Sequence, residues 1–198
     1  MKNRRNFFKK ALVGSAFLGF SALSLRADES LKDDFKQHLK ESDPEFNEIF
    51  SNFLKEVEQK SEILSQKQRA VSILGALIAT QSSFIKDFLK ANLNKNINAV
   101  EVKEVLYQSV AYVGFGRAFS AFKLINESFK ELNIKLPLAK QGTTTRKNRF
   151  EKGLELQISM FGEAIKRANA AASADTRHIR EFLNANCFGD YYTRVGLI

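Results

Sequence analysis

The only cysteine of the chain, Cys187, lies in the segment NANCFGDYYTRVGLI beside an acid, two tyrosines and an arginine. This setting would suit a nucleophilic thiol, which needs a base or a positive neighbour to lower its pKa. His178 precedes Cys187 by nine residues, about two and a half turns of a helix, so the two would not occupy adjacent positions on one face. We therefore expect Cys187 to be a free, partly packed thiol and not a catalytic one.

Histidine and cysteine are also too few for a metal centre. His38 lies in the charged segment KDDFKQHLKESD, where we expect a solvated side chain. Two isolated histidines and one cysteine have no recognisable ligand spacing, so the sequence predicts no metal site. A single cysteine cannot form an internal disulfide either.

The basic charge of the chain is concentrated at its N-terminus. The 198 residues carry a formal net charge of +9, which would normally suggest a nucleic-acid partner. Residues 1–27 hold six basic residues and no acidic one, which leaves 25 basic against 22 acidic residues in the remainder. Runs such as KNRFEK have mixed signs and are typical of solvated faces. We therefore expect no nucleic-acid partner.

Residues 1–27 have the three-part layout of an export signal: a basic region, the apolar run 11–25, and Ala27 before an acidic stretch. The apolar run is short for a membrane-spanning helix. The segment RRNFFK resembles the twin-arginine signal, although it has Asn3 where Ser or Thr is usual and Phe8 where Leu is usual. We expect export to the periplasm by that route, with no stable membrane span after signal removal. An ordinary secretory signal, an uncleaved anchor and a cytoplasmic protein are the alternatives.

The rest of the chain has the periodicity of helices. DPEFNEIFSNFLKEV repeats apolar residues at spacings of three and four, with Asp43 as a possible cap and Pro44 at the start. RAVSILGALIAT is apolar nearly all round, which predicts a helix in the middle of the core. NAVE, residues 98–101, predicts the capped start of a helix that Gly114 and Gly116 interrupt before a phenylalanine-rich helix. No segment alternates convincingly with period two, so we predict an all-α protein.

A linker separates this bundle from the C-terminal part of the chain. Pro137 and QGTTT indicate the linker near residues 135–145. Beyond it, RFEKGLELQISMFGEAIKRA has one apolar face, and IREFL suggests one further helix. We predict a helical domain over residues 28–134 and a C-terminal helical extension over residues 146–198.

The stretch EVKEVLYQSVAYVGFGRAFSAFKLINE resembles the carboxymuconolactone decarboxylase family. In that family an acidic helix start, a small-residue run, a tyrosine-glycine break and an aromatic-rich helix recur. RAVSILGALIAT and FLKANLN look like the family's preceding helices, and the likeness spans residues 44 to 132 as one repeat. The resemblance implies an alkylhydroperoxidase D-like helical bundle.

The C-terminal part looks like the opening of a second repeat. RKNRFEKGLELQISMFGE and RHIREFLNANCFGDYYTRVGL resemble the connector and first helix of members that carry two repeats in tandem. The resemblance therefore implies a tandem-repeat member cut short. The tyrosines and the arginine that follow Cys187 would then pack against the missing part of that second repeat.

Related alkylhydroperoxidase D-type members use a Cys-x-x-Cys pair with a histidine four residues beyond it. This set lets a thiolate attack a peroxide and the pair then close as a disulfide. The resemblance places the three positions near Gln81, Phe84 and Phe88, and none of the three groups is present. This counts against dithiol peroxidase chemistry in this repeat.

The decarboxylase branch of the family acts on a lactone acid without a metal or an organic cofactor. The resemblance therefore implies a helical pocket with a cation for the carboxylate and a proton donor for the developing carbanion. As catalytic candidates, Arg117 would hold the anion and Tyr112 or Glu104 would handle the proton, with Tyr107 and Gln108 as binding residues. In the alternative interpretation Glu104 lies on a solvated helix face, Tyr112 packs and Arg117 is a surface charge.

We therefore predict an exported carboxymuconolactone decarboxylase-like lyase that acts on a small lactone or organic acid without a cofactor. One alternative is antioxidant activity of the peroxiredoxin or alkylhydroperoxidase type, which the family also includes. Another is a non-catalytic assembly subunit that pairs with a separately encoded second repeat. Because family members commonly form rings, and an exposed apolar face needs a partner, we expect a homo-oligomer.

Overall fold

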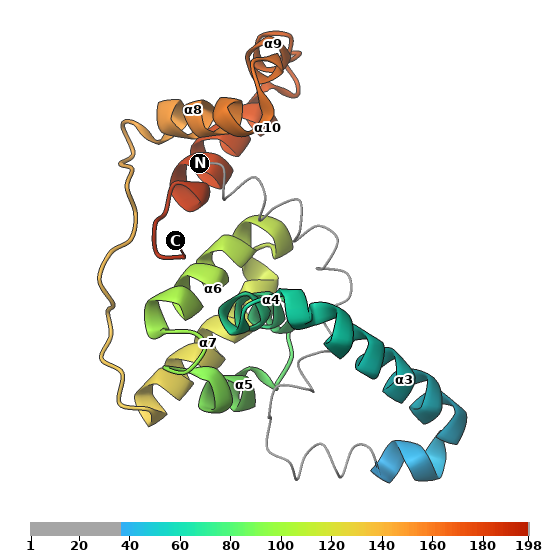
Figure 1. The fold of residues 1–198 in the computed structure, drawn as a ribbon. Helices are drawn as coiled ribbons and strands as arrows, with labels where there is room; N and C mark the ends of the chain where they lie inside the picture. The colour runs from blue at the N-terminus through green and yellow to red at the C-terminus, as the bar shows by residue number, and fades with distance from the viewer. Residues whose placement is uncertain (1–36, 198) are drawn as a thin grey trace.

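The computed structural model describes residues 37–197, and every regular element in this range is a helix (Figure 1), which confirms the all-α prediction. The elements are α3 (Pro44–Lys60), the short 3-10 helix η2 (Ser61–Ile63), α4 (Gln66–Ala79), α5 (Ile85–Asn92), α6 (Ala99–Val113), α7 (Phe115–Glu131), α8 (Arg149–Phe161), α9 (Ala164–Ala170), α10 (Arg177–Phe182) and the π-helical segment η3 (Leu183–Tyr192). The export signal predicted for residues 1–27 lies outside the described range. Within that range no helix is both long and apolar enough to cross a membrane.

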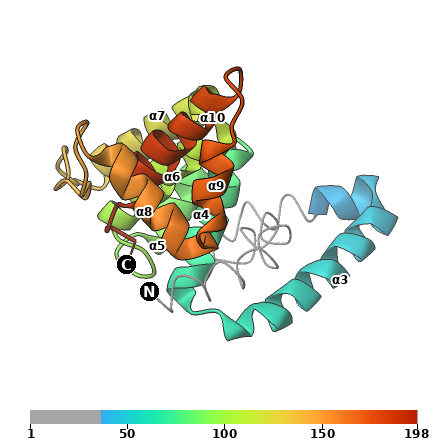
Figure 2. The ribbon, with the colours of Figure 1, turned by 90° about the horizontal axis from the view of Figure 1, so that it is seen from above.

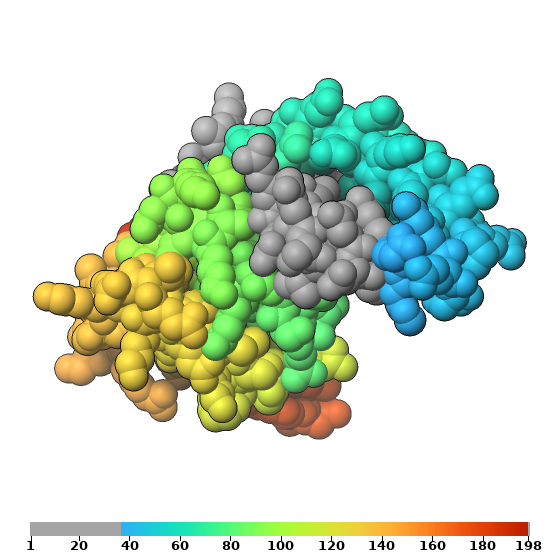
Figure 3. All heavy atoms as spheres, turned by 90° about the horizontal axis from the view of Figure 1, so that it is seen from below, coloured from blue at the N-terminus to red at the C-terminus, as the bar shows by residue number. Residues whose placement is uncertain are grey.

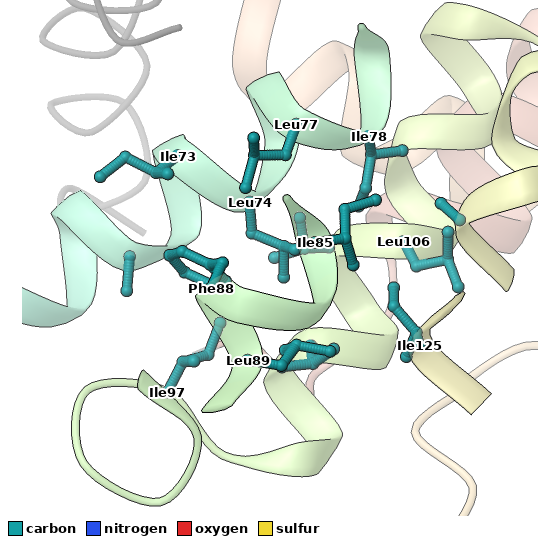
Figure 4. Packing of buried hydrophobic residues seen from close by; sticks show 14 of the residues in the cluster. Ile73, Leu74, Leu77, Ile78, Ile85, Phe88, Leu89, Ile97, Leu106 and Ile125 are labelled. Atoms are coloured by element: carbon teal, nitrogen blue, oxygen red, sulfur yellow. The ribbon is translucent and has the colours of Figure 1, made fainter. Parts of the chain in front are cut away.

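The hydrophobic core lies between α4, α5, α6 and α7 (Figure 4). The apolar run predicted to be central forms α4, in which Leu74 and Ile78 are completely buried. They pack in one cluster with Leu89 of α5, Leu106 of α6 and Ile125 of α7. Each such side chain contributes about 1.5–3 kcal/mol by leaving water, so this cluster fixes α6 and α7 relative to each other.

Of the two helix caps that the sequence predicts, at Asp43 and at Asn98, the structure has the second. At α6 the Asn98 N–H donates to the Glu101 carboxylate at 2.8 Å, and the Glu101 N–H donates to Asn98 Oδ1 at 3.0 Å. This capping box is the one that NAVE predicts, and Ser65 forms another at α4. Asp43 precedes α3, but its side chain makes no cap hydrogen bond. The expectation of a cap there is wrong, because the Asp43 carboxylate accepts instead from the Ser42 hydroxyl at 2.6 Å.

The α3 helix extends away from the bundle (Figures 1 and 3). Its proline start and its apolar spacing form the amphipathic helix that the sequence predicts. Phe46 and Ile49 nevertheless remain 52% and 61% exposed, and Val57 is the buried residue of this helix. An apolar face of this kind is a candidate contact surface for another protein.

The break between α6 and α7 lies at one glycine. Gly114 has a φ of +79°, a backbone conformation that side chains with a Cβ rarely adopt. Gly116, which we expected to interrupt the helix as well, lies inside α7. After α7 the predicted linker contains no helix over residues 134–145 and runs along the bundle to α8 (Figure 1).

The C-terminal helices pack closely on one another at one end of the bundle (Figures 1 and 2). A Cβ atom at Gly153 of α8 would lie 1.8 Å from the Asn184 carbonyl oxygen, and one at Gly189 would lie 2.0 Å from the Arg149 carbonyl oxygen. The glycines therefore allow α8 and η3 to touch along their backbones. An ion pair between Arg149 and Asp190 joins the same two elements.

Candidate functional site

The buried carboxylate of Glu104 lies in the middle of α6. The capped start of α6 and the packing of Leu106 fix this part of the helix, and Glu104 is only 1% exposed. Its two oxygens accept hydrogen bonds from Nε and Nη2 of Arg194 at 2.8 and 2.7 Å. A buried carboxylate is costly unless it is paired, and this bidentate geometry supplies the pairing. The interpretation of Glu104 as part of a solvated helix face is therefore wrong.

The segment that carries Arg194 lies directly against α6. The Val195 N–H donates to the Gln141 carbonyl at 3.2 Å, which joins this segment to the linker. A Cβ atom at Gly196 would lie 2.5 Å from Cγ of Glu104, so the close approach of this segment requires a residue without a side chain. The expectation that the C-terminal arginine would pack against a missing repeat is wrong, because Arg194 packs against the first helical domain.

The guanidinium of Arg194 makes a second contact with α6. Its central carbon lies 5.1 Å from the centre of the Tyr107 ring, within the range of a cation–π interaction. The hydrogen bonds to Glu104 raise the pKa of Arg194 above its ordinary value. Glu104 and Arg194 therefore form a charge-neutral pair, and Tyr107 is held beside them.

A cavity of about 730 Å³ opens beside this pair. Its walls come from α6, α7, the linker and the C-terminal segment, and its volume is in the range of sites for small molecules. The lining residues are Val100, Lys103, Glu104, Tyr107, Phe122, Asn126, Leu136, Pro137, Leu138, Ala139, Lys140, Gln141, Gly142, Thr144 and Arg194.

Lys103 is a buried cation in the wall of this cavity. Its side chain is 7% exposed, and its Nζ donates to Oδ1 of Asn126. The Nζ atom lies 5.8 Å from the centre of the Phe122 ring and 5.6 Å from that of Phe129. Among residues 37–197, no carboxylate forms an ion pair with Lys103. Burial away from water lowers the pKa of Lys103.

The cavity brings together two of the five residues predicted for the site. Glu104 and Tyr107 line it, whereas Gln108, Tyr112 and Arg117 do not. Tyr112 is 66% exposed, and its ring centre lies 6.4 Å from that of Tyr192. Arg117 is exposed near the start of α7, as the surface-charge interpretation expects.

The thiol and metal expectations concern other parts of the chain. Cys187 is half-buried, and burial raises the pKa of its thiol, which disfavours the reactive thiolate. Phe88, at one of the positions of the dithiol motif, is a core residue. In the range 37–197, no group of three histidine, cysteine or acidic side chains is arranged to hold a metal ion.

Sequence reasoning missed Lys103, Asn126 and Arg194 as site residues. Lys103 follows Val102 and precedes Glu104 in EVKEV, where alternating signs look like a solvated helix face. Arg194 is 90 positions from its partner, and no local pattern joins them. The one signal in the sequence was the density of apolar neighbours around Lys103 and Glu104.

Comparisons with known proteins give one match. Residues 44–127 match the sequence profile of the carboxymuconolactone decarboxylase family. No match was found among curated proteins or among solved structures. The profile covers less than half of the chain and ends within α7, so the linker and the C-terminal wall of the cavity lie outside it. Residues 44–127, which form α3 to α6 and most of α7, are therefore similar to the carboxymuconolactone decarboxylase family.

Proposed function

We propose that this protein acts on a small organic acid or lactone in the cavity beside α6, as a carboxymuconolactone decarboxylase-like lyase that needs no cofactor. The observation that carries the proposal is the Glu104 carboxylate, buried yet placed in the wall of a 730 Å³ cavity. The similarity of residues 44–127 to the family supports it.

The chemistry of decarboxylation fits the groups of this wall. Loss of carbon dioxide leaves an electron pair on carbon, which a neighbouring lactone carbonyl delocalises until a proton arrives. In the cavity the Tyr107 hydroxyl can supply this proton, and the Glu104 carboxylate can accept one from a bound substrate. Arg194 keeps Glu104 at a fixed place through two hydrogen bonds, and such fixed placement is what proton transfer to a bound substrate requires.

The test is turnover of a γ-lactone that carries a carboxylate, followed as release of carbon dioxide. The variant Glu104→Gln keeps the shape of the side chain and should lower turnover by about a hundredfold. Arg117→Ala, outside the cavity, should leave turnover unchanged. Circular dichroism of each variant shows whether the fold is kept. Full turnover in folded Glu104→Gln would contradict the proposal.

The expectations on location and assembly also remain proposals. Export through the segment 1–27 would place the protein in the periplasm. Assembly into a homo-oligomer, or pairing with a separately encoded second repeat, is supported by exposed apolar side chains such as Phe115 and Phe119, each 61% exposed. The homo-oligomer is tested by the mass of the purified chain in solution, measured by light scattering. A monomeric mass would exclude it.

A further inference from the structure

We propose that Lys103 makes the cavity a binding site for a small carboxylate with a flat, apolar body. This inference rests on the cavity of the proposed function and names the class of ligand that the cavity holds. It does not depend on whether that ligand is turned over.

The first argument is the charge balance of the cavity. Four side chains in its wall are charged, namely Lys103, Glu104, Lys140 and Arg194. Glu104 and Arg194 neutralise each other through their bidentate pair. Two cations remain, of which Lys140 is exposed and Lys103 is buried. An anion is therefore the ligand that the wall lacks, because a buried ammonium is costly until an opposite charge approaches it.

The second argument is the surroundings of the Lys103 ammonium. An ammonium has three N–H donors, and one of them is used on Oδ1 of Asn126. Within residues 37–197 the other two have no protein acceptor. The rings of Phe122 and Phe129 stabilise the charge through their faces without neutralising it. The charge is thus kept in place and two donors remain for a ligand.

The third argument concerns the kind of anion. An ammonium binds an anion as a point charge, and the single positive charge of Lys103 offsets the one negative charge of a carboxylate but only half the charge of a phosphate dianion. The other polar groups of the wall are already used in part: the Thr144 hydroxyl donates to the Gly189 carbonyl at 2.7 Å, and the Gln141 amide donates to the Ala139 carbonyl at 3.2 Å. Of the cations that line the cavity, Lys103 is the buried one, and two of its donors are free to contact an anion.

The fourth argument concerns the body of the ligand. The rings of Tyr107 and Phe122 both line the cavity and stack with their centres 6.0 Å apart and their planes 29° apart. The linker adds Leu136, Pro137 and Leu138 to the lining. Aromatic and aliphatic walls of this kind favour a planar unsaturated or aromatic body over a sugar or another polyol.

The experiment uses the full chain and three probes: benzoate, its neutral relative benzamide, and inorganic phosphate. Binding is measured by calorimetry or by ligand-observed NMR. We expect benzoate to bind in the millimolar range or better, and benzamide and phosphate to bind at least about tenfold more weakly. The variant Lys103→Met should weaken benzoate by about tenfold or more and leave benzamide unchanged, whereas the exposed Lys147→Met should change neither.

A pH titration gives an independent readout. The titratable groups that line the cavity with Lys103 are Glu104, Tyr107, Lys140 and Arg194. Because its pKa is lowered, Lys103 loses its proton at a lower pH than an ordinary lysine, and the affinity for benzoate should fall as the pH rises into the alkaline range. In Lys103→Arg the charge persists, so benzoate binding should persist at the same pH.

Several results would overturn the inference. They are absence of benzoate binding at millimolar concentration, equal binding of benzoate and benzamide, stronger binding of phosphate, or unchanged benzoate binding in Lys103→Met. Failure of the proposed function is a separate result: carboxylates would bind through Lys103 and no lactone acid would be turned over. Conversely, turnover with unchanged binding in Lys103→Met would reject this inference alone.

Discussion

The pair between Glu104 and Arg194 joins α6 to the C-terminal segment, and removing one of its two partners should strongly destabilise this junction. Replacing Arg194 by Met removes both hydrogen bonds and leaves a carboxylate that is 1% exposed without its partner. Breaking a buried ion pair in this way costs about 3–5 kcal/mol. The Arg194 side chain is itself 19% exposed, so water can partly replace it, and the lower end of that range applies.

We therefore expect Arg194→Met to lower the free energy of unfolding by about 3 kcal/mol, including the lost contact with the Tyr107 ring. For a chain of this size the melting temperature should fall by about 6–12 °C. The assay is urea unfolding followed by far-ultraviolet circular dichroism. Arg146→Met, which changes an exposed arginine with no ion pair among the described residues, should stay within about 0.5 kcal/mol of the unmodified chain.

A double-mutant cycle separates the pair from the rest of the arginine side chain. Glu104→Gln keeps an oxygen that can still accept from Arg194, so its cost should be smaller than that of Arg194→Met. Combining the two changes should reveal a coupling energy of about 2 kcal/mol. A coupling below about 0.5 kcal/mol, or equal losses in Arg194→Met and Arg146→Met, would refute the reasoning.

Three further predictions concern Lys103, the glycines and Cys187. The effect of Lys103→Met on the free energy of unfolding should become less favourable as the pH rises in urea titrations, because between the lowered pKa and the ordinary value of 10.5 the unfolded chain binds a proton that the folded unmodified protein does not. An effect that does not change with pH would contradict this. Gly153→Ala places a Cβ atom 1.8 Å from the Asn184 carbonyl oxygen and should cost about 3 kcal/mol or more in the same assay. Gly75→Ala meets no atom within 4 Å and should add about 0.5–1 kcal/mol. Cys187 should react with an aromatic disulfide reagent more slowly in the folded chain than in urea, because burial raises its pKa; equal rates would contradict this.

The local features of this fold could be predicted because each depends on residues that are neighbours in the sequence. Asn98 and Glu101 are three positions apart, so the residue types and their spacing are enough to predict the reciprocal hydrogen bonds of a capping box. The apolar run of α4 predicts its central place in the core in the same way. At Asp43 the carboxylate accepts from the neighbouring Ser42 hydroxyl and makes no cap hydrogen bond, a local choice that the residue type alone does not determine.

The site could be predicted only in part, because its chemistry depends on contacts across the chain. Glu104 and Tyr107 were identified through the family resemblance, and the structure brings both to the cavity. The family resemblance suggested Arg117 as the residue that holds the anion, yet Lys103 is the cation that the fold buries. The difference between the two cations arises mainly from the rings of α7 and from the linker, which cover Lys103 and are distant from it in the sequence.

The contrast between Lys103 and Glu104 shows how the fold determines the charge of the cavity. Adjacent residues on a helix point in directions about 100° apart. Lys103 accordingly faces α7, through Asn126 and Phe122, while Glu104 faces the C-terminal segment and Arg194. The negative charge is cancelled by an arginine from the end of the described chain, and the positive charge is not. If the C-terminal segment were displaced, the free charge of Glu104 would offset that of Lys103, and the proposed preference for an anion would be lost. Lys103 and Glu104 lie within the family match, whereas Arg194 lies outside it. The charge of the cavity therefore depends on a segment that the family match does not include.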